Sequence, residues 1–146
     1  MGELIAALHA EKIRFLIVGM SAAVLHGAPM ATVDTDLWID LPARQYVRVL
    51  AIAQRIGASI LSGSVLSGSV LGLRDDQRVD FIYRIDGLAS FNTEWKRAPI
   101  LQWAGHEVRV LPLARVIRSK EISNRPKDLA TLPVLRDYLA STKLHK

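Results

Sequence analysis

The segment Phe-Leu-Ile-Val-Gly-Met-Ser at 15–21 decides the fold of this chain, together with Asp-Thr-Asp at 34–36. Four consecutive apolar residues end at a glycine, which is typical of a buried strand that turns at once into the next element. The short run 21–26 follows and is closed by Gly27, so it predicts a helix with Ser21 near its N-cap. This segment therefore predicts a strand, a tight turn and a short helix.

The second segment predicts a strand that carries paired carboxylates. Within 32–41 the polarity alternates, and Asp34 and Asp36 share one face at a separation of about 6–7 Å. Two carboxylates this close repel each other unless water or a divalent cation lies between them, and Mg²⁺ prefers such oxygen ligands. Acids at a turn or an edge strand are the alternative interpretation.

Asp80 is a third acid of interest, because it stands among β-branched and aromatic neighbours in a predicted strand at 78–85. It could add a ligand for a second metal ion in an in-line phosphoryl displacement. A simple ion pair with Arg78 or Arg84 remains the alternative.

The rest of the chain predicts an α/β (α+β) fold, with a small mixed β-sheet flanked by helices. The tandem Leu-Ser-Gly-Ser-Val at 61–65 and 66–70 is interpreted as a flexible connection that leads into a strand near 69–73. Periodicity predicts helices at 3–12, 43–56, 88–93, 113–122 and 127–139 and further strands at 13–18 and 107–111. We expect a single domain over 1–146 with a helical C-terminal end at about 113–140.

Composition excludes several classes of protein. The 146 residues are 50% hydrophobic and 23% charged, a balance typical of a globular chain with a real core. The absence of cysteine excludes disulfide scaffolds, thiolate zinc sites and thiol nucleophiles. No apolar stretch approaches the length of a membrane span, and Glu3 and Glu11 are atypical of a signal peptide, so we expect a cytoplasmic protein.

Positive charge is concentrated in the second half of the chain. Residues 74–146 carry fourteen Lys and Arg against nine Asp and Glu, which accounts for the whole formal charge of +5. Within 109–127 six basic residues face a single acid, Glu121. This pattern indicates a phosphate-bearing partner or, alternatively, a solvated helix face. RNA binding is disfavoured because the segment lacks the interleaved aromatic residues that stack on bases.

The two motif segments resemble the nucleotidyltransferase superfamily related to polymerase beta. Its pattern is a strand, Gly-Gly or Gly-Ser, a short helix, Asp-x-Asp and a distant third aspartate. Phe-Leu-Ile-Val-Gly-Met-Ser-Ala-Ala-Val-Leu-His-Gly at 15–27, with Ala-Thr-Val-Asp-Thr-Asp-Leu-Trp-Ile at 31–39, is similar to minimal bacterial and archaeal members. Arg-Pro-Lys-Asp-Leu-Ala-Thr-Leu at 125–132 resembles the basic helix start near the end of such chains.

The resemblance implies a site and its cofactors. Asp34 and Asp36 would bind metal, and Asp80 would be the third acid, which activates the acceptor hydroxyl. The cofactors implied are two Mg²⁺ ions, with a nucleoside triphosphate as substrate. The remaining residues implied would contact the triphosphate, as its lining or as its cations: Gly19, Ser21, Arg125 and Lys127. For Lys127 a local charge pair with Asp128 is the alternative.

The function that follows is transfer of a nucleoside monophosphate from a nucleoside triphosphate to an acceptor hydroxyl. The resemblance leaves the acceptor open among an antibiotic, a protein side chain and an RNA end, and relatives of this size include antitoxins paired with a toxin protein. Met20, Met30 and Thr35 depart from the family pattern. The alternative is therefore an inactive module on the same fold that binds a nucleotide or a partner protein.

Overall fold

A mixed five-stranded sheet forms the centre of the computed structural model. The structure describes residues 1–32, 34–40, 43–64, 68–73, 77–82 and 84–144, and within these ranges it leaves out the side chains of 43, 44, 60, 62–64, 68–71 and 144. The strands are β1 (Phe15–Val18), β2 (Asp34–Ile39), β3 (Ser59–Ser64), β4 (Gly68–Gly72) and β5 (Arg78–Ile82). Their order in the sheet is β1-β2-β5-β4-β3. The pair β2–β5 is parallel, and the other neighbours are antiparallel.

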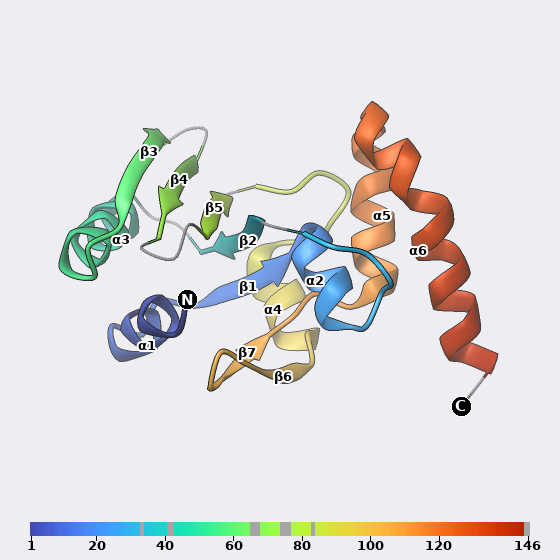
Figure 1. Cartoon of the computed structure of the whole chain (residues 1–146), viewed down its shortest axis with the longest axis horizontal. Helices are drawn as coiled ribbons and strands as arrows, with labels where there is room; N and C mark the ends of the chain where they lie inside the picture. Colours follow the sequence, from blue (N-terminus) through green and yellow to red (C-terminus); the bar gives the residue numbers. More distant parts are fainter. Residues whose placement is uncertain (33, 41–42, 65–67, 74–76, 83, 145–146) are drawn as a thin grey trace.

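A two-stranded ribbon and six helices surround this sheet in the part of the chain that the structure describes. The ribbon pairs β6 (Ile100–Trp103) with β7 (His106–Arg109), and a parallel bridge from Ile17 to Val110 joins it to the edge of the sheet. The helices are α1 (Gly2–Ala10), α2 (Gly19–Leu25), α3 (Ala43–Arg55), α4 (Phe91–Arg97), α5 (Leu113–Ser123) and α6 (Pro126–Leu144). Helix α2 lies between the sheet and α5, and α6 packs along α5 (Figure 1).

The acidic residues of β2 lie in its first half, because its second half is buried in the core. All four residues of β1 are buried, as are Leu37, Trp38 and Ile39 at the far end of β2. Trp38 shares the parity of Asp34 and Asp36, yet α4 covers it, with the Phe91 ring edge-on at 5.3 Å between ring centroids. Only the first half of β2 therefore leaves one face open for carboxylates.

The predicted α+β architecture is confirmed, and four local expectations differ. The Ser/Gly repeat does not act as a flexible connection, because its two copies pair as β3 and β4, with Ser62 opposite Val70; residues 65–67 lie outside the described ranges. Ser21 is not the N-cap of α2, because the glycine turn lets the helix begin directly after Val18. Helix α4 begins at Phe91 because Ser90 caps it, accepting from the amide of Thr93. Strand β6 was not predicted, since its short sequence shows no clear alternation.

Helices α5 and α6 are joined by a buried ion-pair network. Asp128, fully buried at the start of α6, receives the Lys120 ammonium of α5 at 3.2 Å and the Arg125 Nε at 3.0 Å. Burial by itself would raise the pKa of Asp128, but the hydrogen bonds from Arg125 and Lys120 outweigh it and hold that pKa below its ordinary value. The aspartate thus fixes two cations at the junction of the helices.

We predict that Asp128→Asn lowers the free energy of unfolding by about 3 kcal/mol, because it leaves the buried Lys120 ammonium without its counter-charge. Urea denaturation at neutral pH measures this change. Asp137→Asn, at an exposed position of the same helix, is the control and should change stability by less than about 0.5 kcal/mol. Equal effects of the two substitutions would contradict the role of the buried pair.

Candidate active site

The parallel pairing of β2 with β5 brings the three predicted acids to one face of the sheet. Asp36 lies opposite Asp80 and Asp34 lies opposite Arg78 in the strand register. Paired residues of adjacent strands lie about 5 Å apart, and residues two apart on a strand share a face.

 Asp34 and Asp36 are two residues apart in the sequence, whereas the pairing of β5 with β2 brings Asp80 to them from a distant part of the chain. The sheet register, and not the sequence, makes the three acids neighbours.

Gly19 lies directly against the carboxylate of Asp36. It adopts a left-handed conformation, with φ at +63°, and a Cβ atom added there would stand 2.5 Å from Asp36 Oδ2. A side chain at this position would therefore both strain the backbone and displace the carboxylate. The acid on β2 thus requires a glycine directly after β1.

Ser21 hydrogen-bonds to the backbone of the same aspartate. Its buried hydroxyl donates to the carbonyl of Val18 at 2.7 Å and accepts from the amide of Asp36 at 3.1 Å. The turn after β1 is thereby attached to β2 at the level of the acids. Because the hydroxyl proton is already used, Ser21 has a positioning role here, and its contact with a triphosphate stays a prediction.

Burial and the neighbouring acids raise the pKa of Asp36 to about 6. Burial is the largest cause, followed by the negative charges of Asp80 and then Asp34. The cations of Lys120 and Lys127 act in the opposite direction and favour the ionised carboxylate. Asp36 is therefore at the centre of a negative cluster that faces positive side chains.

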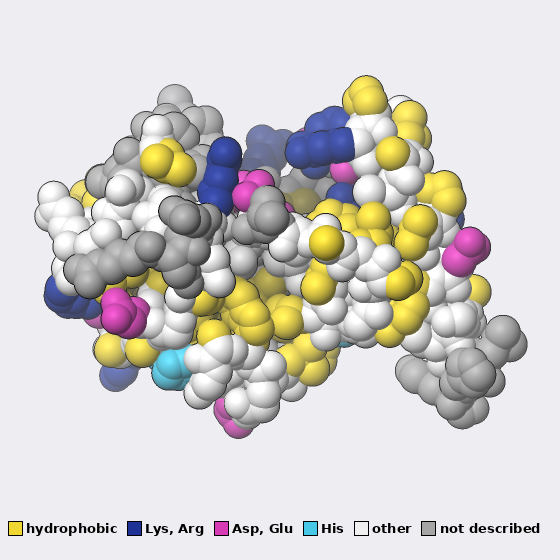
Figure 2. Space-filling model, viewed as in Figure 1, with side chains coloured by type: hydrophobic (Ala, Val, Ile, Leu, Met, Phe, Trp, Pro, Cys, Tyr) yellow, Lys and Arg dark blue, Asp and Glu magenta, His cyan; other side chains and the backbone are white. Residues whose placement is uncertain are grey.

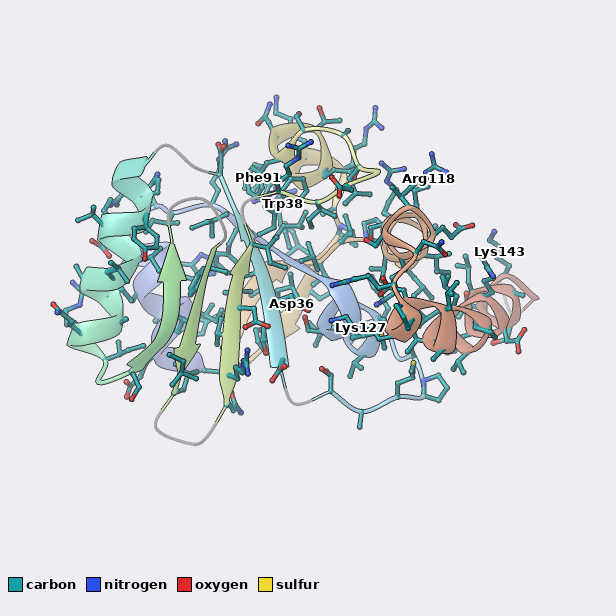
Figure 3. The ribbon with its side chains drawn as sticks, turned by 90° about the horizontal axis from the view of Figure 1, so that it is seen from above. Asp36, Trp38, Phe91, Arg118, Lys127 and Lys143 are labelled. Carbon is teal, nitrogen blue, oxygen red and sulfur yellow. The ribbon has the colours of Figure 1, made fainter. Side chains whose placement is uncertain are left out.

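Those cations come from the C-terminal helices. Figure 3 shows Asp36 on β2 and Lys127 at the start of α6 on facing sides of the site, whereas Arg118 and Lys143 lie on the outer side of α5 and α6. In Figure 2 Lys and Arg side chains line a hollow at the top of the view, between the sheet and the two helices, with acidic side chains beside it. The basic segment predicted to meet phosphate thus contributes one wall of a cleft.

The structure distinguishes among the predicted cations. Arg125 is engaged with Asp128 at 3.0 Å, although its side chain is half exposed. The predicted alternative of a charge pair between Lys127 and Asp128 is wrong, since Asp128 binds Lys120 and Arg125. Sequence reasoning included Lys120 in the basic segment without assigning it to the site, because nothing in the sequence showed which face of α5 turns toward Asp36.

Arg78 belongs to the same face as the acids. Its Nε lies 3.4 Å from Asp80 Oδ1, so the predicted ion pair of Asp80 with Arg78 is confirmed. Arg84 pairs instead with Asp86. Arg78 therefore partly neutralises the acidic cluster from the outer end of β5.

The carboxylates suit a hard divalent cation by their chemistry. Three oxygen-donor side chains share one face. Burial and, after it, repulsion by Asp80 and Asp34 raise the pKa of Asp36, and a bound cation would favour the ionised carboxylates. Among the described residues no group of three or more His, Asp or Glu is already arranged around a common metal position. The oxygen donors are of the chemical type that Mg²⁺ prefers, so the pair on β2 and the single acid on β5 stay the predicted ligands.

Of the three residues that depart from the resembled pattern, Met20 follows Gly19 and Thr35 lies between Asp34 and Asp36. Met20 and Met30 are half buried and pack against the hydrophobic core. Thr35 is also half buried and pairs with Val79 of β5. His26 ends α2 and its ring bonds the carbonyl of Leu111 at 2.9 Å, as expected for a residue packed at a helix end.

Several solved structures are similar to this chain in fold. The antibiotic-resistance factor ANT(2'')-Ia is 16% identical, with a TM-score of 0.63 over 98% of this chain and 84% of its own. The fold is that of nucleotidyltransferases. The lincosamide antibiotic adenylyltransferase LnuA is 13% identical, with a TM-score of 0.61 over 90% of this chain and 91% of its own. A candidate nucleotidyltransferase from Thermotoga maritima is 18% identical, with a TM-score of 0.63 over 94% and 89% of the two chains.

No family model and no curated protein matches the chain by sequence. The described part of the nucleotidyltransferase fold contains no helix long and apolar enough to cross a membrane.

We predict that Gly19→Ala lowers the free energy of unfolding by about 3 kcal/mol, of which about 1 kcal/mol comes from the left-handed backbone and the rest from the contact with Asp36. Gly105→Ala is a matched control, because Gly105 has φ at +80° and nothing within 4 Å of an added Cβ. Chemical denaturation of both variants separates the two costs. The contact with Asp36 is unimportant if the two variants lose the same stability.

We predict that Asp36→Asn stabilises the metal-free protein at pH 8 and much less at pH 4. The pKa of Asp36 is about 6 in the folded protein and about 4 in the unfolded chain, so folding is favoured while the folded state keeps the proton. The penalty on wild type develops between about pH 4 and 6 and reaches at most about 3 kcal/mol above that range. Urea titrations at both pH values, with Asp137→Asn as control, measure the difference. A stabilisation independent of pH would contradict the assignment.

Proposed function

We propose that this protein transfers a nucleoside monophosphate from a nucleoside triphosphate to an acceptor hydroxyl, with release of pyrophosphate. The observation that supports the proposal is the facing arrangement of Asp34, Asp36 and Asp80 with Lys120 and Lys127 across a cleft. Carboxylates can hold a cation that carries phosphate oxygens, and lysines can neutralise the remaining phosphate charge. The solved structures of similar fold include adenylyltransferases that act on antibiotics, which agrees with this chemistry.

The residues have distinct roles in the proposed reaction. Asp34 and Asp36 would hold Mg²⁺, with two ions expected, and the metal would supply charge neutralisation at the reacting phosphate. Asp80 would accept the proton of the acceptor hydroxyl. Lys127, exposed at the start of α6, would bind the triphosphate. Gly19 and Ser21 keep the Asp36 carboxylate in place, and positioning of this kind supplies much of the rate in phosphoryl transfer.

The acceptor remains to be identified by experiment. Nucleoside triphosphates are cytoplasmic metabolites, so we expect the reaction there. A small molecule, an RNA end and a protein side chain are the candidate acceptors, and a toxin protein as acceptor would make the chain an antitoxin. Wild type incubated with α-labelled nucleoside triphosphates, Mg²⁺ and cell lysate should label an acceptor of one of these classes.

We predict that Asp36→Asn lowers the rate of label transfer at least about 100-fold, because it removes a metal-binding carboxylate from the site. The variant should stay folded, which circular dichroism verifies. Binding of nucleotide without any transfer by wild type, under every nucleotide and divalent metal tried, would instead support the inactive binding module.

We predict that Lys127→Gln raises the KM for the nucleoside triphosphate about three- to tenfold, because an exposed charge-assisted contact is lost. Lys143→Gln is the matched control, since Lys143 lies far along the same helix, away from Asp36 (Figure 3). Steady-state kinetics on the labelled acceptor gives both values. Equal KM values for the two variants would remove Lys127 from the site.

A further inference from the structure

A second pocket lies at the opposite end of β1 from the acids. It has a volume of about 630 Å³, and its lining includes Lys12, Arg14, Phe15, Trp95, Val108 and Arg109. We call it the Trp95 pocket. Phe15 pairs with Ile39 in the sheet whereas Val18 pairs with Asp36, so the pocket is about 10 Å or more along the strand from the carboxylates. The start of β1, α1 and the β6–β7 ribbon meet there, away from α5 and α6 (Figure 1).

Arg109 is held in one orientation on the wall of this pocket. Its guanidinium stacks over the Trp95 ring at 4.0 Å from the ring centroid, and its Nη1 donates to the carbonyls of Trp95 at 3.0 Å and Ala98 at 3.4 Å. Among the residues that the structure describes, no carboxylate forms an ion pair with Arg109. A guanidinium fixed by stacking keeps its other N–H groups for a planar oxyanion.

Two further cations share the pocket. Arg14 lies 5.0 Å from the centroid of the Trp95 ring and is paired with Asp40. Lys12 is exposed and has no ion pair within the described ranges. Glu107 is the one acid among the lining residues described, so positive charge dominates. Cations that lack acidic partners attract an anion from solution.

The remaining walls are apolar. Ile13, Phe15 and Val108 belong to the buried core and line the pocket from the side of the sheet. These three side chains are almost fully buried and form the floor of the pocket, whereas Ile100 in the same lining is 52% exposed. Covering Ile100 with an apolar group would be favourable, while the cations would bind an anionic one. The lining therefore favours a molecule that carries both an apolar and an anionic group.

We propose that the Trp95 pocket binds a small organic anion, in which a carboxylate or phosphate group is attached to an aromatic or branched apolar body. The anion contacts Lys12 and Arg109, and the apolar body covers Ile100 over the floor formed by Phe15 and Val108. This site does not rest on the proposed nucleotidyl transfer, because it uses none of the residues assigned to that reaction.

Titration of ¹⁵N-labelled protein, followed by the indole resonance of Trp95, tests the proposal. The probes are phenyl phosphate, benzoate and the neutral benzyl alcohol, and Trp95→Phe assigns the resonance. We expect saturable shifts for the phosphate, the carboxylate or both, and a much weaker response to the alcohol. The anion that binds more tightly shows whether the pocket prefers a phosphate or a carboxylate group. Equal binding of the alcohol, or no saturation by either anion in the millimolar range, overturns the proposal.

Variants locate the binding site. Lys12 has φ at +56°, and asparagine tolerates that conformation, so Lys12→Asn removes the charge without adding backbone strain. We expect it to weaken binding of the better anion about threefold or more, as for loss of an exposed charge contact, and Lys12→Arg to retain binding. Lys143→Asn on α6 makes the same change of charge at a distance. If Lys143→Asn weakened anion binding equally, the effect would come from net charge alone, and the proposed site would be overturned. Asp36→Asn should leave anion binding unchanged, which keeps this test separate from that of nucleotidyl transfer.

Discussion

The close approach of Gly19 to the carboxylate of Asp36 is the constraint on which the rest of the site depends. The left-handed glycine lets α2 begin at the end of β1, and the missing side chain leaves room for the acid on β2. Ser21 then attaches the turn to the Asp36 amide. One backbone geometry therefore fixes the helix, the strand register and the position of the acid together.

The cost of this arrangement is electrostatic. Asp36 is partly removed from water and lies beside Asp80 and Asp34, so its charged form is disfavoured, as its pKa of about 6 shows. The opposing cations belong to α5 and α6, where Asp128 holds Lys120 in a buried pair. A site with unrelieved like charges is less stable than the fold could be, which is typical of sites that bind a cation or a charged substrate.

The two ends of β1 differ in chemistry because different elements cover them. At Val18 the strand meets the aspartates of β2 and faces the lysines of α5 and α6. At Phe15 it meets α1, Trp95 of α4 and the β6–β7 ribbon, where stacked arginines replace the acids. A single short strand thus separates an acidic site from a basic pocket, and ligands of the two sites would not compete for space.

The sequence by itself determined the strand, glycine turn and helix at 15–25, the shared face of Asp34 and Asp36, and the helical C-terminal end, because these follow from local periodicity and backbone geometry. It misjudged the Ser/Gly repeat, whose strands are stabilised by pairing with each other and with β5 and not by their own propensity. Only the tertiary structure decided that Asp80 lies opposite Asp36, that Asp128 binds Lys120 in place of Lys127, and that Arg109 stacks on Trp95. Each of these contacts joins residues whose proximity is set by strand register or helix packing, which a pattern within one segment does not encode.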